Sequence, residues 1–158
     1  MPNYRRNYVP GGCYFFTVNL ADRSQDLLIR HWPLLRQTIQ AVRVDRPFRL
    51  DALVVMPDHL HAVWTLPEHD ADFSSRWRAI KSRFSKALRV EEAVWQRRFW
   101  EHTLKDEASY RRHVDYVHLN PVKHGYVSKI KDWPFSTFHQ YVEKGLYAPD
   151  WMGKHPLG

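Results

Sequence analysis

The sequence predicts one α+β domain in which an antiparallel sheet carries helices packed on one face. Aromatic and β-branched runs alternate with segments of helical periodicity, in the order strand, helix, strand, strand, helix, strand, helix. The first six elements match a split βαβ arrangement. The chain of 158 residues has no repeat, low-complexity tract or long linker, so we expect a single domain over 1–158.

The first half of the chain is expected to supply three strands and one helix after a basic arm over 1–10. Apolar residues at near-helical spacing predict the helix, and β-branched and aromatic runs predict the strands. A tight turn at 56–58 would connect the last two strands. The expected elements are a strand at 14–18, a helix over 27–44, and strands over 49–56 and 59–66.

The clearest helix is predicted over 73–88, where one apolar stripe repeats with helical period. The rest of its circumference is basic, with no acidic residue between positions 76 and 89. Such a face is often only solvated, but its density of positive charge favours contact with phosphates. The expected phosphate-contacting residues of this helix are Arg76, Arg78, Lys81, Arg83 and Lys86.

The second half is expected to add a strand or extended ribbon over 94–101 and a helix over 106–120 that ends before Pro121. The remainder, 135–158, reads as an irregular C-terminal tail. Basic residues stand among aromatic residues in the ribbon, a combination that suits stacking on unpaired bases. Its expected DNA-contacting residues are Arg97, Arg98 and Trp100.

The composition favours a polyanionic partner. Lys and Arg total 24 against 17 acidic residues, which gives a net charge of +7. The single cysteine, Cys13, excludes an intramolecular disulfide and suits a reducing compartment. No apolar run has the length of a membrane span, and no leader pattern opens the chain, so we expect a cytoplasmic protein.

The most informative motif is Asp58-His59-Leu60-His61, inside an apolar run. Side chains alternate along a strand, so His59 and His61 point to the same face. Two imidazoles on one face suit a metal ion, although structural histidines are the alternative. Asp58 is either a turn residue or a carboxylate that orients one imidazole from behind.

A second motif lies in the last predicted helix. Tyr116, Asn120 and His113 cluster on one face of this helix, and Tyr116 and Asn120 are one turn apart. If this face meets the histidine strand, a metal, an amide oxygen and a phenol converge. A phenol can attack a phosphodiester whose charge a divalent metal neutralises, and the product is a covalent phosphotyrosine.

Several other site types can be tested against the sequence. A histidine triad would need His at position 63, which is Val. No His-Glu-x-x-His, Walker loop or Cys-x-x-Cys pair occurs. The aromatic residues at 14–16 leave a metal-independent RNA-binding sheet open.

His59-Leu60-His61 matches the His-hydrophobic-His (HUH) motif, and 116–120 resembles the single-tyrosine motif of HUH transposases. The ordered set of motifs resembles the REP-associated tyrosine transposases and spans about 5 to 141. The stretches that carry the resemblance are Arg5-Arg6, 10–17, 55–61, 95–102, 115–125 and 133–136.

The resemblance implies a ferredoxin-like core with the HUH motif on a central strand. It also implies a Mg²⁺ or Mn²⁺ ion held by His59 and His61, with Tyr116 as the nucleophile. Asn120 stands where mobile single-tyrosine transposases carry Gln as the third ligand, and its amide is shorter.

The implied activity is cleavage and rejoining of single-stranded DNA beside imperfect palindromic hairpins, the REP sequences, through a 5′-phosphotyrosine intermediate. Arg5 and Arg6 correspond to an arginine pair that reads a short guide sequence. The family also implies a monomer rather than a dimer, acting at the bacterial nucleoid. A hairpin-binding protein without catalysis and a small metallohydrolase remain the alternatives.

Overall fold

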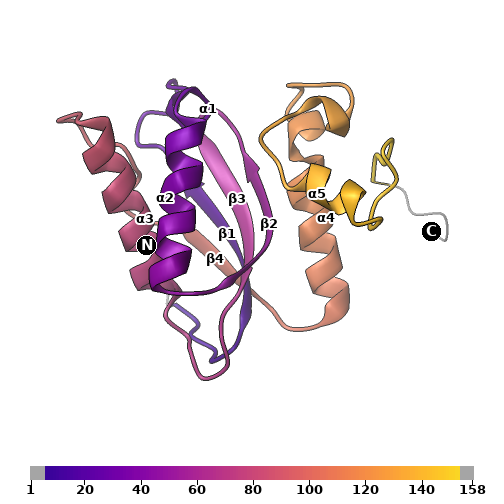
Figure 1. The fold of residues 1–158 in the computed structure, drawn as a ribbon, viewed down its shortest axis with the longest axis horizontal. Helices are drawn as coiled ribbons and strands as arrows, with labels where there is room; N and C mark the ends of the chain where they lie inside the picture. Colours follow the sequence, from indigo (N-terminus) through magenta and orange to yellow (C-terminus); the bar gives the residue numbers. More distant parts are fainter. Residues whose placement is uncertain (1–5, 154–158) are drawn as a thin grey trace, which may run out of the picture.

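The computed structural model describes residues 6–153 and places a four-stranded antiparallel sheet between two helical layers (Figure 1). The strands are β1 (Cys13–Asn19), β2 (Arg49–Val55), β3 (His59–Thr65) and β4 (Trp100–Leu104). Their order is β2-β3-β1-β4, so β3 is central and pairs with β2 and β1. The predicted α+β class, antiparallel sheet and central HUH strand are confirmed.

The helices are α1 (Leu27–Arg30), α2 (Trp32–Asp45), α3 (Phe73–Leu88), α4 (Glu107–Lys123) and α5 (Phe138–Glu143), with a 3₁₀ turn η1 (Ile130–Asp132). Helix α3 has the predicted bounds, and the Asp72 side chain caps it by accepting from the Ser75 N–H at 3.0 Å. The single helix predicted over 27–44 is divided at His31. Pro33 has no N–H for the Ile29 carbonyl, so an uninterrupted helix would lose a hydrogen bond there.

The two faces of the sheet are covered by different helices (Figure 1). Leu60, Ala62 and Trp64 of β3 belong to a core cluster with α2 and α3. Val63, the next residue on the other face, packs in a second cluster with α4. The prediction that all helices lie on one face is therefore wrong for α4. Residues on both faces of β2 and β3 are buried, so each face of these strands is covered.

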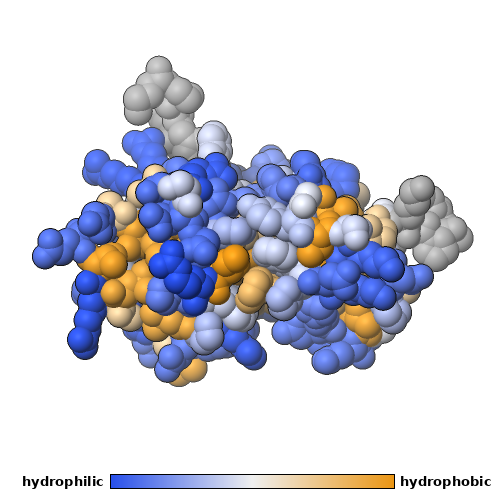
Figure 2. All heavy atoms as spheres, turned by 90° about the horizontal axis from the view of Figure 1, so that it is seen from above, coloured by the Kyte–Doolittle hydropathy of each residue, from blue (hydrophilic) through white to orange (hydrophobic). Residues whose placement is uncertain are grey.

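The larger cluster is built around Trp64. Its indole stacks on Trp77 of α3 with ring centroids 4.3 Å apart and on Phe48 at 4.0 Å. Phe16 of β1 meets it edge-on at 4.8 Å. Seen from above, apolar side chains gather on the half of the molecule that contains α2 and α3, within a mainly hydrophilic surface (Figure 2).

Strand β4 lies further along the chain than the predicted ribbon over 94–101. Trp95 makes only an isolated bridge with Leu20, and its indole N–H donates to the Lys81 carbonyl at 3.1 Å. Lys81 in turn donates from Nζ to the Gln96 carbonyl at 2.8 Å. Contacts with α3 therefore hold this segment, and regular pairing begins only at Trp100.

The prediction that this helix ends before Pro121 is wrong, because α4 continues to Lys123. Pro121 removes the donor to the Val117 carbonyl, and the turn is closed by the His124 N–H, which donates to the Asn120 carbonyl at 2.9 Å. One lost donor is tolerated because Pro121 is buried against neighbouring side chains.

The predicted irregular tail contains α5, and its Phe138, Tyr147 and Trp151 form a third apolar cluster with Ile130 of η1. Residues 135–137 also pair with the edge strand β2, where the Val55 N–H donates to the Phe135 carbonyl and the Thr137 N–H to the Leu53 carbonyl, both at 2.9 Å. Because an unpaired strand edge invites association, this segment protects β2. In the described part of the chain, no helix is long and apolar enough to span a membrane.

A buried polar chain ties α4 to this tail. His118 has no exposed surface, and its Nε2 lies 2.7 Å from Thr137 Oγ1. Its Nδ1 lies 3.1 Å from the Tyr147 hydroxyl, which donates to Asp115 at 2.7 Å. Because Thr137 is bonded to β2, this chain fixes α4 relative to the sheet.

The structure overturns the prediction that Arg76 contacts phosphates. Its side chain is 4% exposed, and all five of its N–H groups are used. They donate to both carboxylate oxygens of Asp70 and to the carbonyls of Arg46, Pro47 and Asp72. The helix turns this residue inward, so it fixes the loops around α3.

Arg76→Met is expected to lower the free energy of unfolding by about 2–3 kcal/mol, because three backbone carbonyls and Asp70 lose their donor. The exposed Arg78→Met on the same helix is the matched control and should stay within about 0.5 kcal/mol of the wild type. Urea unfolding followed by circular dichroism measures both. Equal stabilities of the two variants would show that the buried guanidinium is not needed.

Burial lowers the pKa of His118 to about 3. Below the ordinary imidazole pKa of about 6.5, the unfolded chain therefore binds a proton that the folded chain does not. Stability should fall as the pH decreases from about 6.5 toward 3, by up to about 1.4 kcal/mol per pH unit for this residue.

Unfolding in EDTA at a series of pH values tests this expectation. His118→Gln should show a shallower pH dependence than the wild type, whatever its absolute stability. His69→Gln is the control, because the His69 side chain is 88% exposed. A wild-type slope in His118→Gln would mean that another group causes the acid sensitivity.

Candidate active site

The pairing of β1 with β3 sets the floor of the candidate site. Thr17 is opposite His61, and Asn19 is opposite His59. Both imidazoles point to the face that α4 covers, and each histidine is only 5% exposed. The tight turn predicted at 56–58 is present, since the Met56 N–H donates to the His59 carbonyl at 2.8 Å.

Both histidines have one ring nitrogen occupied by a neighbouring polar group. His59 Nδ1 lies 2.8 Å from Asp58 Oδ1, and the other carboxylate oxygen accepts from Arg23 Nε at 2.7 Å. His61 Nδ1 lies 2.8 Å from the hydroxyl of Thr17. A carboxylate can only accept, so His59 carries its proton on Nδ1 and keeps a lone pair on Nε2. This arrangement is typical of metal-ligating histidines.

The electrostatics keep the imidazoles neutral. Burial lowers the pKa of His61 to about 3, and the neighbouring His59 and His124 act in the same direction. Burial also lowers the pKa of His59, against the opposing effect of Asp58. Burial alone would raise the pKa of Asp58, but hydrogen bonds from His59 and Arg23 bring it below its usual value. A neutral imidazole is the form that binds a metal.

Helix α4 brings Tyr116 and Asn120 to the same histidines. The Tyr116 ring meets the His61 ring edge-on, with centroids 5.5 Å apart. Asn120 is fully buried and donates from Nδ2 to the Tyr116 carbonyl at 3.0 Å. The conditional prediction that these side chains converge therefore agrees with the geometry.

The Asn120 amide oxygen is the most unusual atom of the site. It is buried and has no hydrogen-bond partner among residues 6–153. A buried, unsatisfied carbonyl oxygen costs about 1–3 kcal/mol, so such an atom calls for a ligand. No group of three His, Cys, Asp or Glu side chains in the described chain is placed to hold a metal. The donors that fit a divalent ion are thus His59, His61 and this amide oxygen.

Phe15 of β1 lies between His61 of β3 and Tyr116 of α4. Its ring stacks on His61 at 5.4 Å and meets Tyr116 edge-on at 5.8 Å. His113 packs on the same ring at 5.1 Å and stacks on His102 of β4. Aromatic packing of this kind fixes the direction of the Tyr116 ring.

Sequence reasoning missed Thr17, Phe15 and Arg23 as members of the site. Thr17 and Phe15 lie within the predicted strand at 14–18, but only the pairing register shows that they flank His61. Arg23 lies in the loop after β1 and comes beside Asp58 because the Leu20 N–H donates to the Asp58 carbonyl at 2.8 Å. No local sequence pattern predicts the contact between Arg23 and Asp58.

Most of the predicted DNA-contacting residues are accessible. Trp100 is 63% exposed. Arg83 pairs with Asp45 at 2.6 Å on an exposed surface, whereas the ammonium of Lys81 is held by loop carbonyls. Arg78, Lys86, Arg97 and Arg98 of this set are also exposed.

A basic groove lies between α3 and the segment before β4. Arg6, Arg78, Lys81 and Arg97 line it together with Phe99. The Arg6 guanidinium lies 4.0 Å from the Phe99 ring centroid and donates to the Phe99 carbonyl at 2.8 Å. Arg5, the other member of the predicted arginine pair, lies outside the described residues.

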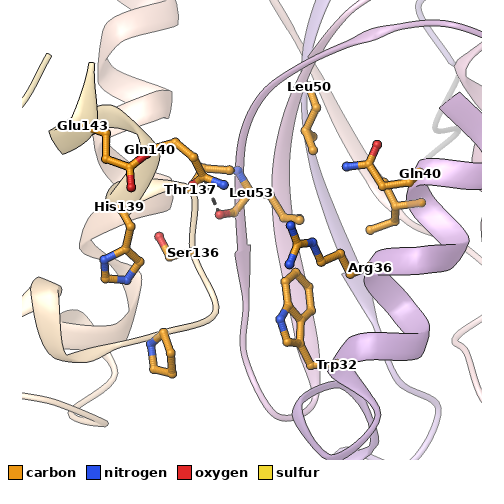
Figure 3. Close-up of a pocket in the computed structure, with 12 residues that line it drawn as sticks. Trp32, Arg36, Gln40, Leu50, Leu53, Ser136, Thr137, His139, Gln140 and Glu143 are labelled. Atoms are coloured by element: carbon orange, nitrogen blue, oxygen red, sulfur yellow. Dashed lines mark hydrogen bonds between the residues drawn. The ribbon is translucent and has the colours of Figure 1, made fainter. Parts of the chain in front are cut away.

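A second pocket lies between α2 and the C-terminal segment, and neither His59 nor His61 lines it (Figure 3). Trp32 and Arg36 of α2 face Ser136 and His139 across the edge of β2. None of the predicted metal ligands or the nucleophile lines it, so it is separate from the candidate active site.

Comparison with known proteins agrees with this geometry. No family model matches the chain. It is 54% identical to the REP-associated tyrosine transposase of Escherichia coli K12, over 97% of this chain and 92% of that protein. The chain belongs to the REP-associated tyrosine transposase family. The resemblance drawn from the ordered motifs is confirmed.

Two further comparisons support the assignment to this family. A Haemophilus influenzae protein of the same family name is 38% identical over 99% of this chain and 97% of its own length. A solved structure described as the REP-associated tyrosine transposase bound to a REP hairpin is 51% identical. The match between the two structures covers 100% of this chain and 97% of the solved chain, with a TM-score of 0.93. The family fold therefore extends over the whole chain.

We expect the purified chain to bind Mn²⁺ through His59, His61 and Asn120. Alanine at any of these positions should weaken binding strongly, and Asp58→Asn should weaken it about 10–100-fold, because His59 loses its orienting carboxylate. Isothermal titration with MnCl₂ measures the affinities, with exposed His69→Ala as the control. Unchanged Mn²⁺ affinity in the double variant of His59 and His61 would refute this ligand set.

Proposed function

We propose that this chain is a metal-dependent single-strand DNA endonuclease and strand transferase that recognises REP-type hairpins. The observation that carries the proposal is the meeting of Tyr116 with the His59 and His61 pair, beside a buried amide oxygen without a partner. A phenol beside two metal-ligating imidazoles suits nucleophilic attack on a phosphodiester better than hydrolysis by a bound water.

His59, His61 and Asn120 would hold the ion, which we propose to be Mg²⁺ or Mn²⁺. When bound, it would neutralise charge on the scissile phosphate. Imidazole and amide donors also accept softer ions, and phosphate chemistry favours these two.

The protein residues then perform the remaining tasks. Phe15 and His61 hold the Tyr116 ring on two sides, so its oxygen is aimed before substrate binds. Attack by that oxygen on phosphorus breaks the bond to the 3′ oxygen. The 5′ phosphate stays on Tyr116, and a 3′ hydroxyl rejoins the strand by the reverse reaction.

The proposed substrate is single-stranded DNA with an imperfect palindromic hairpin. The relative bound to a REP hairpin supports this proposal, since it shares 51% identity over the full chain. Arg97, Arg98 and Trp100 offer exposed charge and an aromatic face before and within β4. The Arg5-Arg6 pair would read a short guide sequence, and Arg6 lines the basic groove.

We further propose that the protein acts as a monomer on DNA in the bacterial cytoplasm, at the nucleoid. Tyr116 reaches the histidines of its own chain, so one copy contains every proposed catalytic group. The hydrogen bond from the Tyr110 hydroxyl to Asp51 at 3.0 Å, with the His118 chain, holds α4 against its own sheet.

Tyr116→Phe is expected to abolish cleavage because it removes the attacking oxygen and leaves the ring packing intact. A labelled oligonucleotide with a REP hairpin is incubated with protein and Mg²⁺, Mn²⁺ or EDTA, then separated on a denaturing gel. The wild type should give a metal-dependent cut, and the fragment that carries the new 5′ phosphate should be linked to the protein. Tyr126→Phe, at an exposed tyrosine, should behave like the wild type.

Two results would redirect the proposal. Hairpin binding without a cut in any metal would favour a binding protein of the same fold. A cut that survives Tyr116→Phe would keep the metal centre and favour a metallohydrolase that uses bound water.

A further inference from the structure

We propose that Lys123 is a further catalytic residue, a fixed cation that contacts Tyr116 and the scissile phosphate. The inference rests on the proposed function. Tyr116, Asn120 and Lys123 are spaced i, i+4 and i+7 on α4, so they form one stripe along the helix. The Lys123 ammonium lies 4.6 Å from the centroid of the Tyr116 ring.

Lys123 is a cation beside the Tyr116 ring whose charge no described carboxylate offsets. It is exposed, and in the described part of the chain it forms no ion pair with a carboxylate. Arg23, the other cation near the histidines, is bound to Asp58 at 2.7 Å. The charge of Lys123 is therefore available to a ligand of opposite sign.

The reaction needs such a charge at this position. The Tyr116 hydroxyl makes no hydrogen bond with another residue of 6–153. The Tyr116 ring packs against the rings of Phe15 and His61. Within 6–153, therefore, no carboxylate accepts a hydrogen bond from this hydroxyl. Positive charge must then stabilise the negative oxygen, and fixed charges do so most effectively in a site partly shielded from water.

The step balances without any proton moving from Lys123. The phenol gives its proton to water, its oxygen forms a bond to phosphorus, and the bond from phosphorus to the 3′ oxygen breaks. The departing 3′ oxygen keeps the electron pair and takes a proton from water. Lys123 stays an ammonium throughout and offsets negative charge first on the phenolate and then on the phosphoryl oxygens.

Lys123 would serve differently from the exposed basic residues of α3 and of the segment before β4. Those lie on the other side of the sheet or at its edge, whereas Lys123 contacts the proposed nucleophile itself. Loss of a general DNA-binding charge weakens binding at all steps. Loss of a charge that acts on the reacting atoms lowers the rate at saturating DNA and leaves affinity nearly unchanged.

The test compares Lys123→Met, Lys123→Arg and the matched control Lys129→Met, at an exposed lysine beyond α4. Single-turnover formation of the covalent DNA adduct is measured at saturating hairpin, with hairpin affinity measured separately in EDTA. Lys123→Met should form adduct about 100-fold more slowly, as expected for loss of one transition-state contact. Lys123→Arg should recover most of the rate, and Lys129→Met should match the wild type.

Three results would overturn the inference. Adduct formation by Lys123→Met at the wild-type rate would show that the cation is not used. A loss confined to hairpin affinity would make Lys123 a general DNA contact. If the wild type forms no adduct, the proposed function fails, and the role of Lys123 fails with it. If the wild type forms adduct and Lys123→Met does so at the same rate, only the role of Lys123 is refuted.

Discussion

The two-sided burial of β3 is the constraint on which the rest of this molecule depends. Its side chains alternate, so Leu60, Ala62 and Trp64 build the main core while His59 and His61 face the opposite layer. A slip of one residue in register would exchange the two sets and put the imidazoles among tryptophan rings. The same packing that stabilises the fold therefore fixes where the site can be.

The second requirement is that α4 remains docked on the face with the histidines. Apolar contacts from Val114 and Val117 supply part of this docking, and buried polar contacts make it specific. His118 reaches Thr137, which is itself bonded to the edge strand β2. The C-terminal segment thus supports α4, although it contributes no proposed catalytic group. Full satisfaction of such a buried network favours one arrangement over others.

Much of this could be predicted from sequence, because the relevant signals are local. Periodicity gave the bounds of α3, and a spacing of i and i+4 put Tyr116 and Asn120 on one stripe. What failed depends on tertiary contacts. The inward turn of Arg76, the cover that α4 gives to the second face and the pairing of Thr17 with His61 all follow from how elements meet. The five basic residues of α3 look alike in sequence, and only the neighbouring loops decide which is buried.

The charge on the proposed ligands gives the site its chemical character. Two neutral imidazoles and an amide would leave the full charge of a divalent ion directed at the substrate, whereas carboxylate ligands would offset much of it. The one nearby carboxylate, Asp58, is held behind His59 and shared with Arg23. A polyanionic substrate that brings its own negative charge fits such a centre. The groups that contact the Tyr116 ring fit the same logic, since the Phe15 and His61 rings are neutral and the Lys123 ammonium is positive, whereas a negative neighbour would oppose both the attacking phenolate and the incoming phosphate.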